Sequence, residues 1–520
     1  MKTAVLPIVG RAKVYRKKIA IVSDGIEFTY QDIVDASENV AYFLLRHKDY
    51  TQKTPVIFIN KRTFSYVAIL FGIWRAGGIA VPLAVNLPLP ELEYFIDHLD
   101  PTIIIADQEF EAIATQAARK RGVKVVESRE ALEDNNRKMQ NKNPNLPNIQ
   151  LDEEAMILYT SGTSGKKPKG VLLTHKNIQA RVECLESAMP GNNVDHILHV
   201  LPLYHAYGVI GVLAWSLWIG AKCELLSKFT ADSVWSHIIH GQSNIFFGVP
   251  TMYVKLIDSW TAASSEMKDA MSHGCLRYRL MVSGSSGMRV NTLKMWKNIS
   301  THTILERYGG NEIGVVLSNS VHGTRIPGSI GMPLTNMQVS LKDEFGNEVT
   351  EGKAGEICVK GPVLFAGYWK EPEATQKAII DAWFHTGDIA VKKNGFFKFL
   401  GRSNLDIINT GGYTISALEV EEVLLSHPSI NQCAVLGVED ATWGQRVCAA
   451  VVLKEGHDSI TIDSLRQWSK RRISTYKIPT QLLILNELPH TELNKIAKSA
   501  IKKFLDSTSA TMIKTSIIPN

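Results

Sequence analysis

A run made almost entirely of hydroxyl, glycine and lysine residues lies between two apolar segments, 156–159 and 171–173. Its chemically capable members are Thr160, Ser161, Gly162, Thr163, Ser164, Gly165 and Lys169. Glycine lets backbone N–H groups turn toward an anion, hydroxyls add donors, and lysine adds a mobile positive charge. Two strands joined by such a loop indicate a phosphate-binding site, although the run does not match the GxxxxGK[ST] pattern. A polar hairpin loop is the alternative interpretation.

Other residues able to do chemistry stand in short polar segments further along the chain. They are glycines, serines, aromatic residues and charged residues: Ser283, Gly284, Ser285, Arg307, Tyr308, Gly309, Asn311, Glu312, Asp388, Arg402, Gly411, Gly412, Tyr413 and Lys495. Each has an ordinary alternative explanation when taken alone. Asp388 follows Thr-Gly, as turn residues often do, and Lys495 lies in a lysine-rich segment.

Composition limits the classes that this chain can belong to. Its 520 residues exceed what one hydrophobic core supports, so at least two domains are expected. The hydrophobic content of 45% and the charged content of 21% are ordinary for a globular protein, and a net charge of +6 is weak evidence for a nucleic-acid partner. The six cysteines are scattered without a CxxC pair or a neighbouring histidine cluster. This favours buried thiols over disulfides or zinc ligands.

The sequence predicts no membrane span. The most apolar segment, 206–221, has sixteen residues interrupted by glycines, which is short of the roughly 20 residues that a membrane helix needs, so it is expected in the core. Residues 1–18 are basic without an acid, as in transit peptides, but they lack serine and run into a strand-like segment. A basic first helix and a cytoplasmic protein are expected, with the mitochondrial matrix as the alternative location.

The elements that must position the polar segments alternate in type. Amphipathic or apolar helices are expected near 30–47 and 209–218. Between and around them lie apolar runs with the length of buried strands: 54–59, 79–82, 102–106, 197–201, 244–249 and 279–283. Strands that alternate with helices predict an α/β fold with mostly parallel sheets. After Gly328, short strands and turns predict a small β-rich subdomain, and an α+β unit follows residue 401.

Several motifs occur in one order along the chain: 159–165 with 168–170, 307–312, 383–388, 401–402, 411–413 and Lys495. Through them the chain, from about residue 18 to 505, resembles the adenylate-forming superfamily of acyl-CoA synthetases, peptide-synthetase adenylation domains and firefly luciferases. The resemblance implies a large N-terminal domain of two βα-layered sheets plus a small β-barrel-like subdomain, and a small mobile α+β C-terminal domain. The implied boundaries are an N-terminal domain at 1–400, a hinge at 401–406, a C-terminal domain at 407–507 and a tail at 508–520.

The same resemblance implies a two-step ligase reaction. A carboxylate attacks the α-phosphate of ATP, pyrophosphate leaves, and the CoA thiol then attacks the acyl-adenylate. Because anions must meet, placed cations are the expected catalysts. By resemblance the catalytic residues are Lys495 and Lys169, which carry positive charge, and Glu312, which acts through a bound cation. Glu312 would hold Mg²⁺, a hard cation that accepts one or two carboxylates.

Binding roles also follow from the resemblance. The loop 160–165 would bind phosphates, and Asp388 with Arg402 nearby would bind the ribose. Tyr308 would stack on the adenine, and the loop with Gly284 and Ser285 would approach the base. Asn311 would donate to a phosphate, and Ser283 and Gly309 would belong to the same ATP site. The pantetheine arm of CoA would pass Gly411, Gly412 and Tyr413.

The closest resemblance within the superfamily is to malonyl-CoA synthetases, through the segments 199–203, 306–309, 325–328, 406–419 and 442–447. Arg307 directly precedes Tyr308, so its side chain is expected at the acyl pocket, where a guanidinium offers a bidentate fork to a second carboxylate. A salt bridge to Glu306 is the alternative. His205 is expected to line the same pocket, with a core histidine as the alternative. Malonate or a methyl-branched short dicarboxylate is therefore the expected acid.

The chain departs from the superfamily pattern at a few positions. Asn311 stands where threonine is usual, Asn494 stands where glycine is usual, and the glycine-rich loop is one residue longer. Three alternatives therefore stay open: a ligase for a medium- or long-chain monocarboxylic acid, an enzyme that loads a carrier protein, and a catalytically weakened nucleotide-binding relative. The expected partners are a small carboxylic acid, ATP and CoA, without nucleic acid; the sequence does not indicate an oligomeric state.

Overall fold

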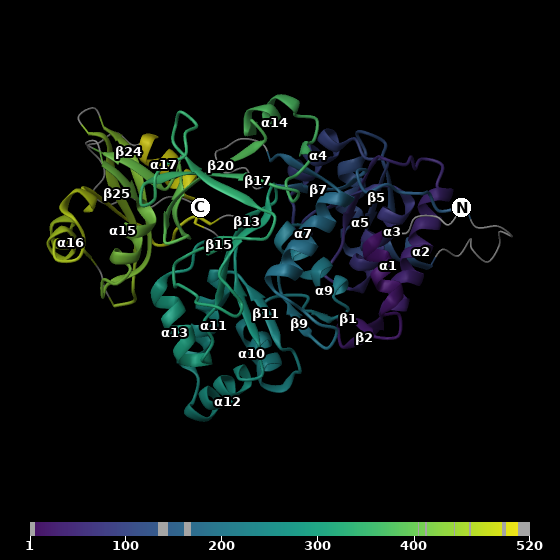
Figure 1. The fold of residues 1–520 in the computed structure, drawn as a ribbon, viewed down its shortest axis with the longest axis horizontal. Coiled ribbons are helices and arrows are strands. Elements are labelled where there is room, and N and C mark those ends of the chain that lie inside the picture. The colour runs from purple at the N-terminus through teal and green to yellow at the C-terminus, as the bar shows by residue number, and fades with distance from the viewer. Residues whose placement is uncertain are drawn as a thin grey trace. The chain divides into compact units, whose positions relative to one another are not determined.

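The computed structural model describes residues 6–133, 144–160, 168–403, 405–410, 413–440, 443–456, 459–490 and 496–507. The chain divides into two compact units, and Figure 1 labels many of their elements. The first unit comprises residues 1–161, 168–338 and 360–382, and the second comprises 162–167, 339–359 and 383–520. The segment 339–400, expected in the N-terminal domain, falls mostly into the second unit. The hinge at 401–406 stays a prediction.

The first unit contains two mainly parallel sheets, the larger with antiparallel pairs at both edges and the other with antiparallel pairs at one edge. The larger described sheet has the order β15-β14-β13-β12-β11-β9-β10-β1-β2. Its strands are β1 (Ile19–Ser23), β2 (Ile26–Thr29), β9 (His196–His199), β10 (Lys222–Leu225), β11 (Ile245–Gly248), β12 (Leu280–Ser283), β13 (Leu305–Gly310), β14 (Gly314–Ser318) and β15 (Met332–Pro333). The strands from β1 to β13 along this order pair in parallel, which confirms the predicted βα units.

The second sheet of this unit has the order β18-β8-β7-β4-β3-β5-β6. Its strands are β3 (Pro55–Ile59), β4 (Ile79–Pro82), β5 (Ile103–Ala106), β6 (Lys124–Glu127), β7 (Glu154–Tyr159), β8 (Gly170–Thr174) and β18 (Gly367–Tyr368). The central strands β3, β4 and β5 are buried along their whole length, as expected for strands covered on both faces. The strands β7 and β8 pair antiparallel with Tyr159 opposite Gly170, so the predicted strand–loop–strand arrangement is confirmed.

Helices surround both sheets, and α10 to α13 gather beside β11 (Figure 1). The described helices of this unit are α1 (Pro7–Val14), α2 (Tyr30–Arg46), α3 (Phe64–Ala76), α4 (Leu89–Leu99), α5 (Gln108–Ala118), α6 (Ser128–Glu133), α7 (His175–Ala188), α8 (Ala206–Gly208), α9 (Trp215–Trp218), α10 (Ala231–His240), α11 (Pro250–Ala262), α12 (Ser265–Cys275), α13 (Val290–Ser300) and α14 (Pro372–Ala378). Capping residues mark the ends of several helices. Thr29 and Asp32 form a capping box at the start of α2, and α3 ends at Gly77, which has a left-handed backbone conformation.

The apolar segment 206–221 lies in the core, as predicted, but it is not one regular α-helix. Between α8 and α9 the residues Val209–Ala214 form a π-helix, and all six are buried. Such π segments often occur at functional sites because they change the direction of a side chain by part of a turn. Within the described part of the chain, no helix combines the length and the apolar character that crossing a membrane requires.

The second unit has a β-rich part and an α+β part. In the first, β17 (Ala354–Lys360) pairs with β20 (Trp383–Lys393), and β20 pairs with β21 (Phe396–Arg402); β16 (Gln338–Lys342) precedes them. The short β19 (Ile379–Ile380), which follows α14, falls in the first unit. The second part contains β22 (Ile407–Thr410), β23 (Tyr413–Ser416), β24 (Ile430–Asp440), β25 (Gly444–Leu453), β26 (Gln481–Ile484), α15 (Ala417–Leu424), α16 (Ile462–Ser469), the 3₁₀-helix Thr475–Lys477 and α17 (Lys498–Ser507).

The α+β part has a hydrophobic layer on each side of its sheet. Val420 and Leu424 of α15 and Leu465 of α16 pack in one layer, and Ile501 and Leu505 of α17 pack in the other. The predicted α/β class, with two layered sheets and a C-terminal α+β region, is confirmed. All six cysteines are buried and free of disulfides, as expected.

Candidate active site

Candidate residues of the first unit gather where neighbouring parallel strands end. The strand β11 ends at Gly248, β12 ends at Ser283 and β13 ends at Gly310. Ligands of open α/β sheets bind outside the carboxyl ends of the strands, so this edge is the expected position for a site. The hydroxyl of Tyr207, on α8, reaches the same edge and donates a hydrogen bond to the Gly248 carbonyl over 3.1 Å.

Arg307 lies on β13 with its guanidinium buried between two aromatic rings. Its Cζ atom is 4.5 Å from the ring centroid of Tyr207 and 5.0 Å from that of Phe247, and the residue is only 5% exposed. Nη1 lies 3.9 Å from the sulfur of Met189. Nε and Nη2 are buried without a hydrogen-bond partner among the described residues. The guanidinium is therefore held in place by rings and not by a counter-ion.

This environment favours an anionic ligand. Burial lowers the pKa of Arg307, an effect that Tyr207 partly offsets. An unpaired buried charge is costly, and a carboxylate is the ligand that best satisfies a guanidinium, through two parallel hydrogen bonds. The pocket wall thus carries a cation that contacts Tyr207 and whose Nε and Nη2 lack a hydrogen-bond partner of good geometry among the described residues.

The alternative interpretation of Arg307, a salt bridge to Glu306, is wrong. Neighbouring residues on a strand point to opposite faces of the sheet, and the Glu306 carboxylate accepts a hydrogen bond from the Gly328 N–H over 2.9 Å instead. Burial raises the pKa of Glu306 to about 8, although the Gly328 and Met288 N–H groups oppose the shift. Glu306 therefore stays protonated at neutral pH.

The loop after β12 lies against Arg307. A Cβ atom added to Gly284 would stand 3.3 Å from the Tyr207 ring and 3.6 Å from Cγ of Arg307, so a side chain at this position would crowd both. Ser285 has a φ of 74°, which is uncommon for a residue with a side chain and is a form of local strain found at binding sites. The Ser283 hydroxyl is buried without a partner among the described residues. The loop expected at the adenine therefore adjoins the residue expected at the acid.

Asn311 joins two of the elements around this edge. Its side-chain oxygen accepts a hydrogen bond from the Ala206 N–H, and its amide nitrogen donates one to the Tyr159 carbonyl, both over 3.1 Å. One amide N–H remains for a phosphate, but the main effect of Asn311 is to tie the end of β7 to the start of α8. This explains how asparagine can stand where the superfamily has threonine.

The neighbouring candidates have defined positions too. Gly309 approaches β14 so closely that an added Cβ would lie 1.9 Å from the Gly314 carbonyl oxygen, so glycine is required there. Tyr308 is half-buried on β13. His205 directly precedes α8, and its ring centroid lies 4.6 Å from that of Tyr204. His205 therefore lies next in sequence to the elements that hold Arg307 and Asn311.

Glu312 and Lys169 meet through a residue that the sequence analysis missed. The hydroxyl of Tyr368 donates a hydrogen bond to Oε1 of Glu312 over 3.1 Å, and Nζ of Lys169 lies 4.6 Å from the centroid of the Tyr368 ring. Thr160 donates its N–H to the Lys169 carbonyl over 3.0 Å, which closes the base of the glycine-rich loop. Tyr368 thus links the expected metal ligand to the expected phosphate ligand. It lies 56 residues from Glu312, and no motif signalled it.

Arg181 is a second residue that the sequence analysis missed. Its guanidinium donates to the Glu312 carbonyl over 3.0 Å and to the Val363 carbonyl over 2.9 Å. Burial lowers the pKa of Arg181 to about 9, while Glu312 opposes this shift. Because Arg181 holds the backbone on which Glu312 stands, it is a positioning residue for that carboxylate.

The second unit brings Asp388 and Arg402 together, as predicted. They face each other on β20 and β21, and Nε of Arg402 lies 3.0 Å from Oδ1 of Asp388. The preceding turn is fixed by hydrogen bonds, since Gly387 donates its N–H to Glu356 over 2.8 Å and the Thr386 hydroxyl donates to the Ile357 carbonyl over 2.8 Å. The Asp388 carboxylate is therefore held by its strand, its turn and its cation.

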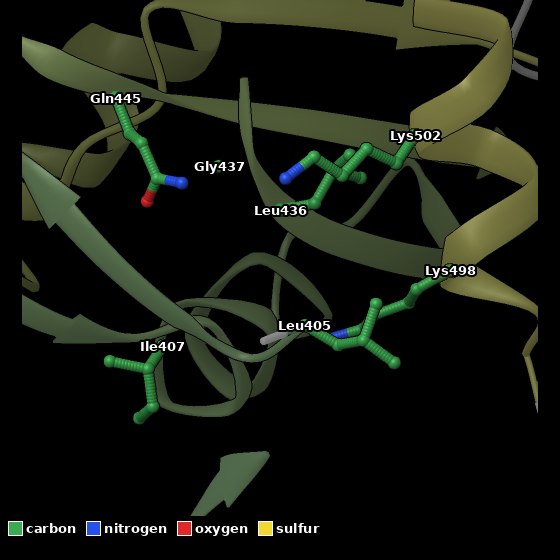
Figure 2. Close-up of a pocket in the computed structure, with 7 residues that line it drawn as sticks. All are labelled: Leu405, Ile407, Leu436, Gly437, Gln445, Lys498 and Lys502. Carbon is green, nitrogen blue, oxygen red and sulfur yellow. The ribbon is translucent and has the colours of Figure 1, made fainter. Parts of the chain in front are cut away.

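The segment after Arg402 carries a buried charge cluster. Nζ of Lys498, on α17, lies 2.5 Å from a carboxylate oxygen of Asp406 and 2.6 Å from one of Glu421. Burial alone would lower the pKa of Lys498, but the two carboxylates raise it. Figure 2 shows a pocket beside this cluster, into which Lys498 and Lys502 project from α17. Its other lining residues are Leu405, Ile407, Leu436, Gly437 and Gln445.

Several predicted site residues lie outside the described residues. They are Ser161, Gly162, Thr163, Ser164, Gly165, Gly411, Gly412 and Lys495. The backbone of Tyr413 begins β23, but its side chain is not described. Their roles stay predictions.

Comparison with known proteins identifies the class to which this fold and site belong. Residues 9–369 match the family model of AMP-binding enzymes, and residues 419–495 match that of the AMP-binding enzyme C-terminal domain. The chain belongs to the AMP-binding enzyme family, which confirms the resemblance found in the motifs.

Proteins similar to this chain include malonate–CoA ligases. The chain is 38% identical to the mitochondrial malonate–CoA ligase ACSF3 of Homo sapiens over 95% of this chain and 91% of that protein. It is 34% identical to a malonate–CoA ligase of Arabidopsis thaliana over 94% of this chain and 86% of that protein. Among solved structures, ATP-bound MatB from Rhodopseudomonas palustris matches with a TM-score of 0.86 and 26% identity, covering 96% of this chain and 99% of the other.

Proposed function

We propose that this chain is an ATP-dependent malonate–CoA ligase, which forms malonyl-adenylate and then transfers the malonyl group to the thiol of CoA. The observation that carries the proposal is Arg307, whose buried Nε and Nη2 have no partner among the described residues. Malonate keeps one free carboxylate after the other has been adenylated. That free carboxylate is the group that a guanidinium binds through two hydrogen bonds.

The surroundings of Arg307 favour a short acid. The Gly284 loop, which we assign to the nucleotide, packs close to Arg307, since a Cβ added to Gly284 would stand 3.6 Å from Cγ of Arg307. An acid that bridges the adenylate and the guanidinium therefore spans few carbon atoms. A fatty acid would place a long apolar chain against a buried charge, which is unfavourable. The names of the human and Arabidopsis relatives support the same acid.

We assign the remaining nucleotide contacts by the roles that the resemblance implies. Tyr308 would stack on the adenine, with Ser283, Gly284, Ser285 and Gly309 around the base and Asn311 reaching a phosphate. Asp388 would accept hydrogen bonds from the ribose hydroxyls, and Arg402 would keep its carboxylate ionised and oriented. The loop 160–165 and Lys169 would bind the phosphates through backbone N–H groups, hydroxyls and charge.

Glu312 fits a magnesium ion. Its Oε1 accepts a hydrogen bond from Tyr368, and among the described residues Oε2 forms no hydrogen bond or ion pair. Mg²⁺ keeps most of its waters and binds through one or two carboxylates, which matches a single half-buried glutamate. When bound, Mg²⁺ would neutralise phosphate charge. Arg181 and Tyr368 would hold Glu312 in place for this role.

The second step would use the C-terminal residues. Lys495 would bridge the carboxylate and the α-phosphate during adenylation, and Gly411, Gly412 and Tyr413 would form the passage for the pantetheine arm of CoA. A rotation about residues 401–406 would exchange the two faces of the domain 407–507, since hinges absorb large changes in φ and ψ within a few residues. The mitochondrial location of the human relative favours the mitochondrial matrix over the cytoplasm.

A panel of acids tests the proposal. We expect pyrophosphate release that depends on ATP, Mg²⁺ and malonate, with CoA-dependent formation of AMP. Malonate or methylmalonate should exceed acetate and octanoate in kcat/KM, because only the dicarboxylates pair with Arg307. The KM for ATP should not change between acids.

Three outcomes would contradict the proposal. Equal or better use of octanoate would indicate a monocarboxylate ligase. Transfer to a phosphopantetheine carrier protein but not to CoA would indicate a carrier-loading enzyme. ATP binding without pyrophosphate release from any acid would indicate a relative that has lost catalysis.

A further inference from the structure

Three metal-ligating side chains meet on one face of the hairpin formed by β17 and β20. Nδ1 of His385 lies 2.8 Å from Oε2 of Glu356 and 3.5 Å from the sulfur of Cys358. One ligand atom from each of the three residues lies within 4.8 Å of the other two. Sequence analysis missed this cluster, because His385 is 27 residues from Cys358 and only strand pairing brings them together.

The strand register explains why the three side chains share a face. Cys358 pairs directly with His385, and Glu356 stands two residues before Cys358, where side chains return to the same face. The pairing shifts register between Glu356 and Cys358, where β20 advances four residues while β17 advances two, so the irregularity lies in β20 next to His385. Bulges often redirect a side chain next to a functional site. The cluster is thus fixed by backbone hydrogen bonds and not by mobile loops.

We propose that Cys358, His385 and Glu356 form a binding site for a zinc-like divalent transition-metal ion. Sulfur, imidazole nitrogen and carboxylate oxygen are the three donor types of zinc sites. The sulfur is buried, whereas the His385 and Glu356 side chains are 20% and 26% exposed, so an ion can enter from that side. Three protein ligands leave a fourth position open to water or another ligand.

Small adjustments convert the metal-free arrangement into a coordination site. The Cys358 sulfur is 3.5 Å from Nδ1 and 3.9 Å from Nε2 of His385, so it lies over the face of the ring. Rotation of the ring about its Cβ–Cγ bond would point a nitrogen lone pair at the ion. Oε1 of Glu356 can keep the hydrogen bond from the Gly387 N–H, measured at 2.8 Å, while Oε2 leaves His385 for the metal. The Gly387 N–H would then orient the ligating carboxylate.

Binding must release the thiol proton. Burial, together with Glu356, raises the pKa of Cys358 to about 12, although Lys342 acts in the opposite direction, so the free site holds a neutral thiol. The metal ion forms a bond to sulfur as the S–H bond breaks, and the proton passes to the buffer. One proton is therefore expected for each metal ion bound at neutral pH.

Cobalt is the probe, because Co²⁺ replaces Zn²⁺ and reports a sulfur ligand by a charge-transfer band in the near ultraviolet. Titration of the full-length, chelator-treated protein with CoCl₂ should give a saturable band at one ion per chain, removed by added ZnCl₂. Cys358→Ser should abolish the band and the proton release. His385→Asn should weaken cobalt binding by about 10-fold or more, since even outer-shell changes at metal sites cost 10- to 100-fold.

Cys448→Ser is the matched control, because Cys448 is another fully buried cysteine on a strand, whose pKa burial also raises to about 12. It should keep the band. X-ray absorption of the wild-type zinc complex should show one sulfur ligand, whatever the folding of the variants. A zinc spectrum without sulfur, no saturable cobalt band, or a band that persists in Cys358→Ser would overturn the proposal.

Discussion

Two arginines of the first unit are buried to nearly the same extent and have opposite surroundings. Arg75 is 7% exposed, and its guanidinium lies 2.7 Å from the Glu38 carboxylate and donates to the Val34 carbonyl over 2.6 Å. Arg307 is 5% exposed and contacts two aromatic rings without a carboxylate. Arg75 therefore completes a structural network between α2 and α3, whereas Arg307 leaves donors for a ligand.

The comparison shows that burial of a charge does not by itself indicate function. Lys498 follows the pattern of Arg75, with Asp406 and Glu421 as its carboxylates. Arg181 has no such carboxylate among the described residues, but two of its nitrogens donate to the backbone carbonyls of Val363 and Glu312. What distinguishes Arg307 is that its guanidinium has neither a carboxylate nor a carbonyl partner among the described residues. A pocket that must bind an anion has to keep its cation unpaired, and the neighbouring rings of Tyr207 and Phe247 make that possible by favourable contact with the guanidinium face.

Replacement of each arginine by methionine should separate the two roles most clearly. Arg75→Met leaves the Glu38 carboxylate without its cation and should lower the free energy of unfolding by about 3–5 kcal/mol. Arg307→Met removes an uncompensated buried charge and should leave that free energy unchanged or raise it by about 1–3 kcal/mol. Chemical denaturation of the ligand-free protein measures both. A large loss of stability in Arg307→Met would mean that Arg307 is structural after all.

Glu306 extends the comparison to a buried acid without a cation. The pKa of Glu306 is about 8 in the folded protein and about 4.3 in the unfolded chain. The protonated carboxyl therefore contributes its full share of stability below pH 4.3, and this share is lost as the pH rises through 8. Glu306→Gln should raise the free energy of unfolding at pH 8 by about 2–4 kcal/mol relative to its effect at pH 4. Denaturation at the two pH values measures this, with the exposed Glu344→Gln as the control. A pH-independent effect would contradict the assigned pKa.

The half-exposed pair of His237 and Glu224 should show the smallest effect. The hydrogen bond to Glu224 raises the pKa of His237, and burial acts in the opposite direction. Burial alone would raise the pKa of Glu224, but the hydrogen bonds from His196 and His237 outweigh it and hold that pKa at about 2. The contribution of protonated His237 is complete below its unfolded pKa of about 6.5 and is lost as the pH rises through the higher folded value.

His237→Gln should therefore cost less than about 1 kcal/mol at pH 5.5 and nothing at pH 9, because exposed pairs contribute little. His240→Gln, an exposed change on the same helix, is the control. Thermal unfolding at both pH values provides the measurement. A cost that grows with pH would contradict the sign of the shift.

Sequence patterns predicted elements better than contacts between distant elements. The apolar runs that became β3, β4 and β5 are visible because buried parallel strands are apolar throughout. The π-helix at Val209–Ala214 is not visible, because it differs from an α-helix only in hydrogen bonding. Motif order indicated Arg307, Glu312 and Asp388.

The partners of those residues could not be predicted in the same way. Tyr207 and Phe247, which hold Arg307, are distant in sequence and carry no polar motif. Tyr368 reaches Glu312 only because β18 pairs with β8. The meeting of Cys358 with His385 depends on the register of β17 and β20. Pairings across a sheet depend on the whole fold and leave little trace in one sequence.

The central claim is that Arg307 binds the second carboxylate of the acid, and monomethyl malonate tests it most directly. The ester keeps the carbon skeleton of malonate and one carboxylate, but it lacks the second charge. In the wild-type protein, kcat/KM for malonate should exceed kcat/KM for the ester roughly 30- to 1,000-fold, which corresponds to about 2–4 kcal/mol. In Arg307→Met this ratio should fall to near one. Equal use of both acids by the wild-type protein, or a ratio unchanged in Arg307→Met, would contradict the claim.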